Sequence, residues 1–147
     1  MTAQRREKLA VVRRYADRLE SEAAGRLAAV ANDAKAAEQL LQELVAYRSE
    51  YLTPPGSRQH WQAQHWDDYY EFLRRLDRAV TAQQEIVEQH EQRVRAVREE
   101  WQRLRMRSDS LEHMDKRLLK AEQQHAEQIA QKEADAWTLI AAVRQAH

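Results

Sequence analysis

The only two prolines of the chain, Pro54 and Pro55, are adjacent and are followed directly by Gly56. Proline removes a backbone N–H and clashes with the preceding helical turn, whereas glycine lets the backbone reverse sharply. The rest of the sequence has helical character throughout and contains only one other glycine, Gly25. We therefore predict two helices, one over about residues 2–52 and one over about 58–146, joined by a tight turn at about 53–57.

The composition supports long helices rather than a compact globule. A third of the 147 residues are charged, and the mean hydropathy is −0.90. Such a composition is typical of long helices and coiled coils. We therefore predict an all-α fold, in which residues 1–147 form a single domain built as an antiparallel two-helix coiled-coil hairpin with the second helix longer than the first.

The second predicted helix carries a heptad pattern. Starting at Tyr69, alternating steps of four and three residues land mainly on apolar side chains as far as Leu111, and the same steps continue to Val143 with more ionisable positions. This 3.5-residue period indicates a coiled coil. In the first helix the apolar pattern runs through Leu9, Val12, Ala16, Leu19 and Ala23, and a step of four to Leu27 predicts a stutter there.

The two predicted helices differ in length, roughly 75 Å against roughly 130 Å at 1.5 Å per residue. If they fold back at the turn, Thr2 falls opposite a residue near position 110. Residues 112–147 then overhang without a partner in the chain, so their apolar side chains are exposed, frayed or covered by another molecule.

Aromatic residues are concentrated around the predicted turn. Seven of the ten aromatic residues fall between Tyr47 and Phe72. With the heptad positions a and d taken as the contact line, Phe72, Ala79 and Ile86 all occupy position g, so the apolar face is widened near the turn. Surplus apolar surface often marks a partner-binding site; burial under the first helix or in a self-association would also explain it.

No residue pattern indicates catalysis, a cofactor or a bound metal. The chain has no cysteine, and none of its six histidines is spaced i, i+4 with another, so helical zinc binding is unsupported. No glycine-rich phosphate loop, secretory signal or stretch long enough to span a membrane is expected. Equal numbers of basic and acidic residues, 24 each, argue against nucleic-acid binding. The arginines between residues 93 and 107 could contact phosphate or an acidic partner, but a solvated flank of the coiled coil is the interpretation we favour.

Two segments flanking the predicted turn carry a distinctive aromatic pattern. The first has paired tyrosines, Tyr47 and Tyr51, and the second reads Tyr-x-x-Phe-Leu-x-x-Leu-x-x-Ala from Tyr69 to Ala79. These segments resemble the flagellar export protein FliJ family, and the resemblance covers roughly residues 35 to 140. The chain departs from the family pattern at Gln83, where relatives can have histidine, and at Ala136, which replaces a common glutamate.

The resemblance implies a non-enzymatic stalk and adaptor of the flagellar type III protein export apparatus, similar to the central stalk subunit of rotary ATPases. The implied partners are the export ATPase ring, the cytoplasmic domain of the export gate, and export chaperones. The implied location is the cytoplasm, peripheral to the inner cell membrane. The implied processes are flagellum biogenesis, flagellar protein export by type III secretion, protein transport and chemotaxis. Matching positions imply these gate-binding residues: Leu44, Tyr47, Tyr51, Phe72, Leu76, Ala79 and Gln83.

Three alternatives remain open from the sequence. An injectisome stalk protein of the same architecture is poorly distinguished from a flagellar one. A structural rod that self-assembles through the overhanging residues is a second possibility, and a weak nucleic-acid binder using the arginine segment is a third.

Overall fold

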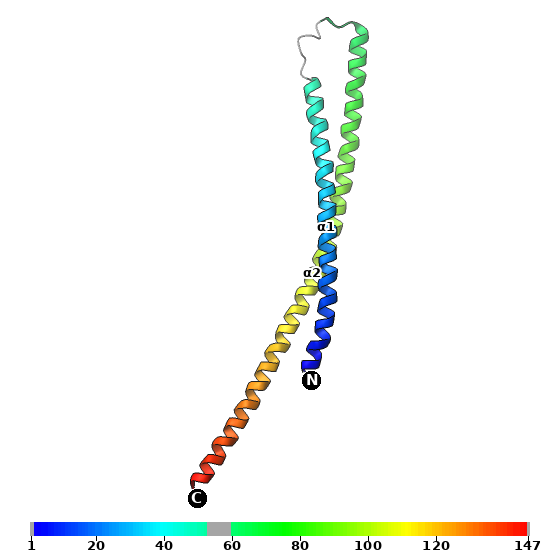
Figure 1. Ribbon diagram of the computed structural model, residues 1–147. Helices are drawn as coiled ribbons and strands as arrows, with labels where there is room; N and C mark the ends of the chain where they lie inside the picture. The colour runs from blue at the N-terminus through cyan, green and yellow to red at the C-terminus, as the bar shows by residue number, and fades with distance from the viewer. Residues whose placement is uncertain (1, 53–59, 147) are drawn as a thin grey trace. The chain divides into compact units, whose positions relative to one another are not determined.

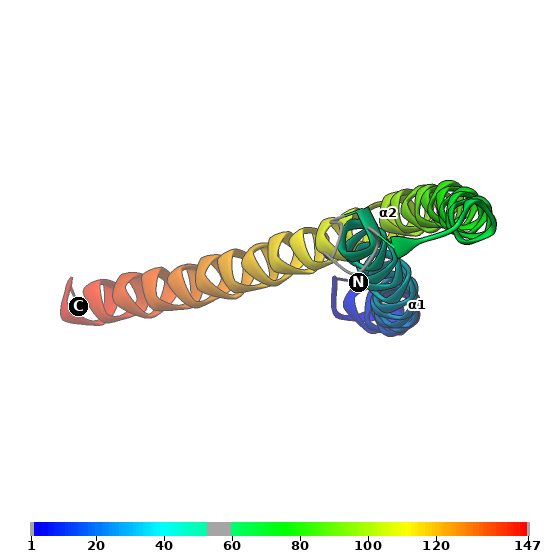
Figure 2. The same ribbon diagram turned by 90° about the horizontal axis from the view of Figure 1, so that it is seen from above.

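The computed structural model describes residues 2–52 and 60–146, and nearly all of them are helical. Helix α1 spans Thr2–Leu52 and helix α2 spans Ala63–Ala146, and both are uninterrupted along these ranges (Figures 1 and 2). The two helices pack against each other, α2 is the longer, and no strand is present within the described ranges. The predicted all-α, two-helix fold is therefore confirmed. The predicted turn at 53–57 lies outside the described residues.

The start of α2 is set by a local cap at Gln62. The Gln62 carbonyl accepts hydrogen bonds from the backbone N–H groups of His65 (3.0 Å) and Trp66 (3.2 Å). In return, Nδ1 of His65 accepts a hydrogen bond from the Gln62 N–H at 3.2 Å. A side chain three residues into a helix that reaches back to the cap N–H satisfies a donor that the helix itself cannot. The helix thus begins at Ala63 rather than near 58, and ten residues separate α1 from α2.

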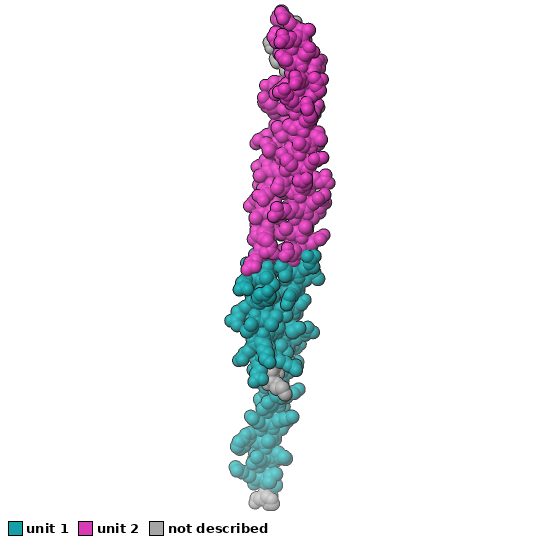
Figure 3. Space-filling view, turned by 90° about the vertical axis from the view of Figure 1, so that its right-hand side faces the viewer, with its two compact units in different colours: residues 1–21, 102–147 teal, residues 22–101 magenta. Residues whose placement is uncertain are grey.

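The contacts of the chain group into two units (Figure 3). The single domain stays a prediction of the sequence. Unit 1 contains Met1–Ser21 and Gln102–His147, and unit 2 contains the continuous segment Glu22–Trp101. In each unit, a segment of α1 packs antiparallel against a segment of α2.

Unit 2 has an apolar contact line with small residues on the α1 side. On α1 the buried residues follow one another at intervals of seven: Ala23, Val30 and Ala37. On α2 the buried residues are Leu76, Val80, Gln83 and Val87. Because alanine has only a methyl side chain, its burial at this contact brings the two main chains close together.

Unit 1 has a more polar contact line. Leu9 and Ala16 are its buried apolar residues on α1, and Arg6 forms ion pairs with Asp115 and Glu122 on α2. Thus α1 reaches as far as Glu122, not only to position 110, which corrects the predicted overhang of 112–147. The later start of α2 shifts the pairing in this direction. Residues 123–146 of α2 are exposed.

The heptad pattern predicted for α2 matches the burial of its side chains. From Tyr69 to Glu122, every position on the predicted contact line is buried or half-buried. On α1, however, the contact line contains Arg13 and Glu20, and the predicted Val12 is 41% exposed. When these charged residues are counted, buried and half-buried residues recur at alternating intervals of three and four residues from Arg6 to Tyr51. The step of four from Ala23 to Leu27 is part of this regular pattern, so the predicted stutter is absent.

Candidate functional site

A cluster of three aromatic rings joins the two helices of unit 2 near the end of α1. The ring of Tyr51 lies 4.9 Å from that of Tyr47 and 4.8 Å from that of Phe72. Tyr47 on α1 and Phe72 on α2 have ring centroids 6.3 Å apart. The Tyr47 hydroxyl donates a hydrogen bond to the Tyr51 hydroxyl at 3.2 Å. This bond, with a smaller contribution from burial, raises the pKa of Tyr47 above its ordinary value.

A second group of rings lies at the beginning of α2. Trp61, Trp66 and Tyr69 contact one another at centroid distances of 5.4–6.0 Å. The Tyr69 hydroxyl donates a hydrogen bond to the backbone carbonyl of Tyr51. That carbonyl belongs to the last turn of α1, where the helix has no partner for it. Tyr69 therefore caps the end of α1 from α2 and ties the two helices together there.

The seven predicted gate-binding residues all lie in unit 2 but differ in exposure. Tyr47 is 43% exposed, and Leu76 and Gln83 are buried in the contact line. The amide of Gln83 donates a hydrogen bond from Nε2 to the carbonyl of Ala37 at 3.0 Å. The remaining four are half-buried: Leu44, Tyr51, Phe72 and Ala79. The exposed and half-buried members can touch a partner, whereas Leu76 and Gln83 lie beneath them.

Exposed apolar residues extend the ring cluster along one edge of unit 2. Leu40, one heptad before Tyr47, is 47% exposed, and Ile86, one heptad after Ala79, is 41% exposed. Residues seven apart lie on the same side of a coiled-coil helix. We call Leu40, Tyr47, Phe72, Ala79 and Ile86 the docking edge. The heptad count identified its α2 members, but Leu40 was missed because it lies next to Leu41 in the sequence.

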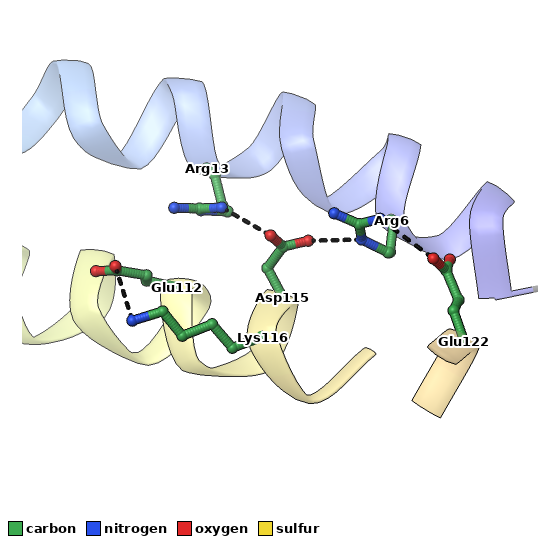
Figure 4. Close-up of polar contacts among 6 residues, drawn as sticks. All are labelled: Arg6, Arg13, Glu112, Asp115, Lys116 and Glu122. Atoms are coloured by element: carbon green, nitrogen blue, oxygen red, sulfur yellow. Dashed lines mark hydrogen bonds and ion pairs between the residues drawn. The ribbon is translucent and has the colours of Figure 1, made fainter. Parts of the chain in front are cut away.

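A charged cluster holds the two helices of unit 1 together (Figure 4). Asp115 accepts hydrogen bonds from Arg6 at 3.2 Å and from Arg13 at 3.0 Å. Arg6 also donates to Glu122 at 3.2 Å. These bonds, first to Asp115 and then to Glu122, raise the pKa of Arg6. The sequence predicts Asp115 and Glu122 on the contact line, but not that arginines of α1 would neutralise them.

One arginine of the segment, Arg105, forms an ion pair from α2 to α1. Arg105 forms ion pairs with Glu20 (3.8 Å) and Asp109 (3.5 Å), and Glu100 pairs with Arg26 at 3.0 Å. These pairs fit the interpretation of the segment as a coiled-coil flank. No group of three or more potential metal ligands occurs among the described residues. Neither helix, over its described length, has a segment apolar enough to cross a bilayer.

The family model described as "Flagellar FliJ protein" matches residues 5–147. No curated protein and no solved structure matches the chain significantly.

Proposed function

Because the chain belongs to the FliJ family, whose role is related to flagellar protein export, we propose that it is a non-enzymatic stalk and adaptor of the export apparatus. In this proposal it contacts three kinds of partner: the export ATPase ring, the cytoplasmic domain of the export gate, and export chaperones. It would act in the cytoplasm, at the inner face of the cell membrane.

The docking edge is the feature of unit 2 that supports gate binding. It presents apolar side chains from both helices along one side of the pair, and Leu40, Tyr47 and Ile86 are each more than two-fifths exposed. Exposed apolar groups gathered in this way favour a protein partner, since covering them removes apolar surface from water. We propose that the gate domain contacts this edge directly and that Leu44, Tyr51, Leu76 and Gln83 support it from the contact line.

The proposal is tested with substitutions that leave the helix pair intact. Leu40→Asp and Ile86→Asp place a charge on the docking edge at exposed positions, so we expect gate-domain binding to weaken by about tenfold or more, measured by calorimetry. Val45→Asp is the matched control, because Val45 is 47% exposed on the same helix as Leu40 but on a different side. Equal loss of binding in all three variants, or in none, would rule out the docking edge.

Unit 1 supports a different contact. Its helix pair is joined by the charged cluster, and beyond Glu122 the exposed apolar residues of α2 include Trp137 (69%) and Leu139 (67%). By analogy with stalk subunits, we propose that this unit contacts the ATPase ring. The chain would then contact the gate through unit 2 and the ATPase through unit 1.

A pull-down with purified export ATPase and gate domain separates these two contacts. Leu139→Asp should reduce capture by the ATPase and leave capture by the gate domain unchanged, whereas Ile86→Asp should do the reverse. Loss of both contacts with either substitution would contradict the assignment of the two partners to separate units.

A further inference from the structure

Gln83 is the one buried polar residue among those that the structure describes, with 7% of its surface exposed. A buried amide costs free energy unless its hydrogen-bonding groups find partners. Its Nε2 group donates to the backbone carbonyl of Ala37 at 3.0 Å, across the two helices. A helical carbonyl can accept this second bond because its oxygen has two lone pairs.

The size of residue 37 makes this bond possible. The positions one heptad away on the same contact line of α1 are Val30 and Leu44. Both side chains are bulkier than the methyl group of Ala37, so the two main chains cannot approach each other as closely at those positions. Ala37 is the position of these three at which the structure shows a side chain of α2 bonded to the carbonyl.

An apolar heptad pattern by itself specifies register weakly. If α2 slides by seven residues, roughly 10 Å along the axis, apolar positions again face apolar positions. Such a slide would place Gln83 opposite Val30 or Leu44 and leave its amide buried without a partner. Within unit 2, the Tyr69 hydroxyl also bonds across the helices, to the Tyr51 carbonyl at the end of α1. The ion pairs Arg26–Glu100 and Arg48–Asp77 are about half exposed, and exposed pairs contribute little. Gln83 supplies the buried polar contact away from that end.

We propose that Gln83 is a positioning residue: its hydrogen bond to Ala37 sets the register of α1 against α2 and thereby brings Tyr47 and Tyr51 beside Phe72. This role differs from direct contact with the export gate, which the family resemblance implies for position 83. The consequence for gate binding rests on the proposed function, whereas the role in register does not.

The absence of cysteine from the sequence makes register measurable by cross-linking. Each test chain carries Arg26→Cys on α1 and a second cysteine on α2, and a short bis-maleimide linker joins the two when they lie close together. Cross-linking to Glu100→Cys reports the native register, because residues 26 and 100 form an ion pair. Cross-linking to Arg93→Cys or Arg107→Cys reports a register shifted by one heptad. With Gln83 present, we expect cross-linking to position 100 alone. With Gln83→Leu, we expect the yield at 93 or 107 to rise at least about tenfold while helicity by circular dichroism is retained. Gln84→Leu makes the same change at an exposed neighbour and should leave the pattern native.

Two further measurements complete the test. Ala37→Val holds the two main chains further apart while keeping Gln83, so the hydrogen bond is lost and the same shifted cross-links should appear. Gate binding lost in Gln83→Leu should return when the chain is first cross-linked between positions 26 and 100, because the native register is then restored without the amide. Cross-linking of Gln83→Leu at position 100 only would overturn the proposal. Failure of the cross-link to restore binding would assign position 83 a direct contact instead. If the unsubstituted chain does not bind the gate, the proposed function fails and the cross-linking pattern still decides the register.

Discussion

Replacing Gly25 by alanine should stabilise the helix pair. Gly25 lies inside α1, and no atom outside its immediate helix surroundings lies within 4 Å of a methyl group built at this position. Glycine costs roughly 0.8–1 kcal/mol relative to alanine within a helix, because it loses more backbone entropy on folding. The full gain is expected here, since the added methyl meets no neighbour and the backbone already has a negative φ. A gain of about 1 kcal/mol corresponds to about a fivefold larger folding constant and a rise in Tm of about 3 °C for a chain of this size.

Urea and thermal unfolding followed by circular dichroism measure this change. Ala28→Gly, at an exposed position one turn further along α1, is the matched reverse substitution and should lower stability by a similar amount. If Gly25→Ala leaves stability unchanged or lowers it, position 25 must be in contact with another part of the molecule. The open surroundings described for Gly25 would then be wrong.

The charged cluster and the paired tyrosines give two further predictions. Asp115→Ala removes the acceptor shared by Arg6 and Arg13, so it should lower stability by about 1 kcal/mol and speed amide exchange selectively at the start of α1; uniform exchange along the chain would contradict the local role. The raised pKa of Tyr47 means that the folded state favours the neutral phenol. The stability that the neutral Tyr47 contributes is therefore fully present below the ordinary tyrosine pKa of about 10 and is lost as pH rises through the folded-state pKa. Tyr51→Phe removes the acceptor and should lower the pKa of Tyr47 towards its ordinary value in an NMR titration of labelled tyrosine rings, whereas an unchanged titration would refute the hydrogen bond as its main cause.

Much of the fold could be predicted from local sequence signals. The end of α1 follows from the two prolines, and the contact line of α2 follows from its heptads. Which residues of α1 face α2 was harder to predict, because charged residues also occupy the contact line. Arg13 and Glu20 lie at positions that a count of apolar residues assigns to Val12 and Leu19. Their burial depends on oppositely charged partners about a hundred residues away in the sequence, which a local pattern does not reveal.

The candidate site could also be predicted only in part from the sequence. Meeting of the Tyr47 and Phe72 rings follows from folding the chain back near residue 54. The depth of each side chain depends on the exact register, which the length of the connection changes. The sequence predicts a short connection at about 53–57. The cap formed by Gln62 and His65 instead delays the start of α2 to Ala63, so the connection is longer. That difference moved Asp115 and Glu122 into reach of Arg6.

The burial of Ala16, Ala23 and Ala37 limits how thick the molecule can be at these levels. Where a methyl group separates two backbones, any larger side chain forces them apart, and the neighbouring layers lose contact as well. Evolutionary change at these three positions should therefore be confined to glycine, alanine and serine. A partner that encircles the helices at any of these levels would need an opening matched to two closely packed helices.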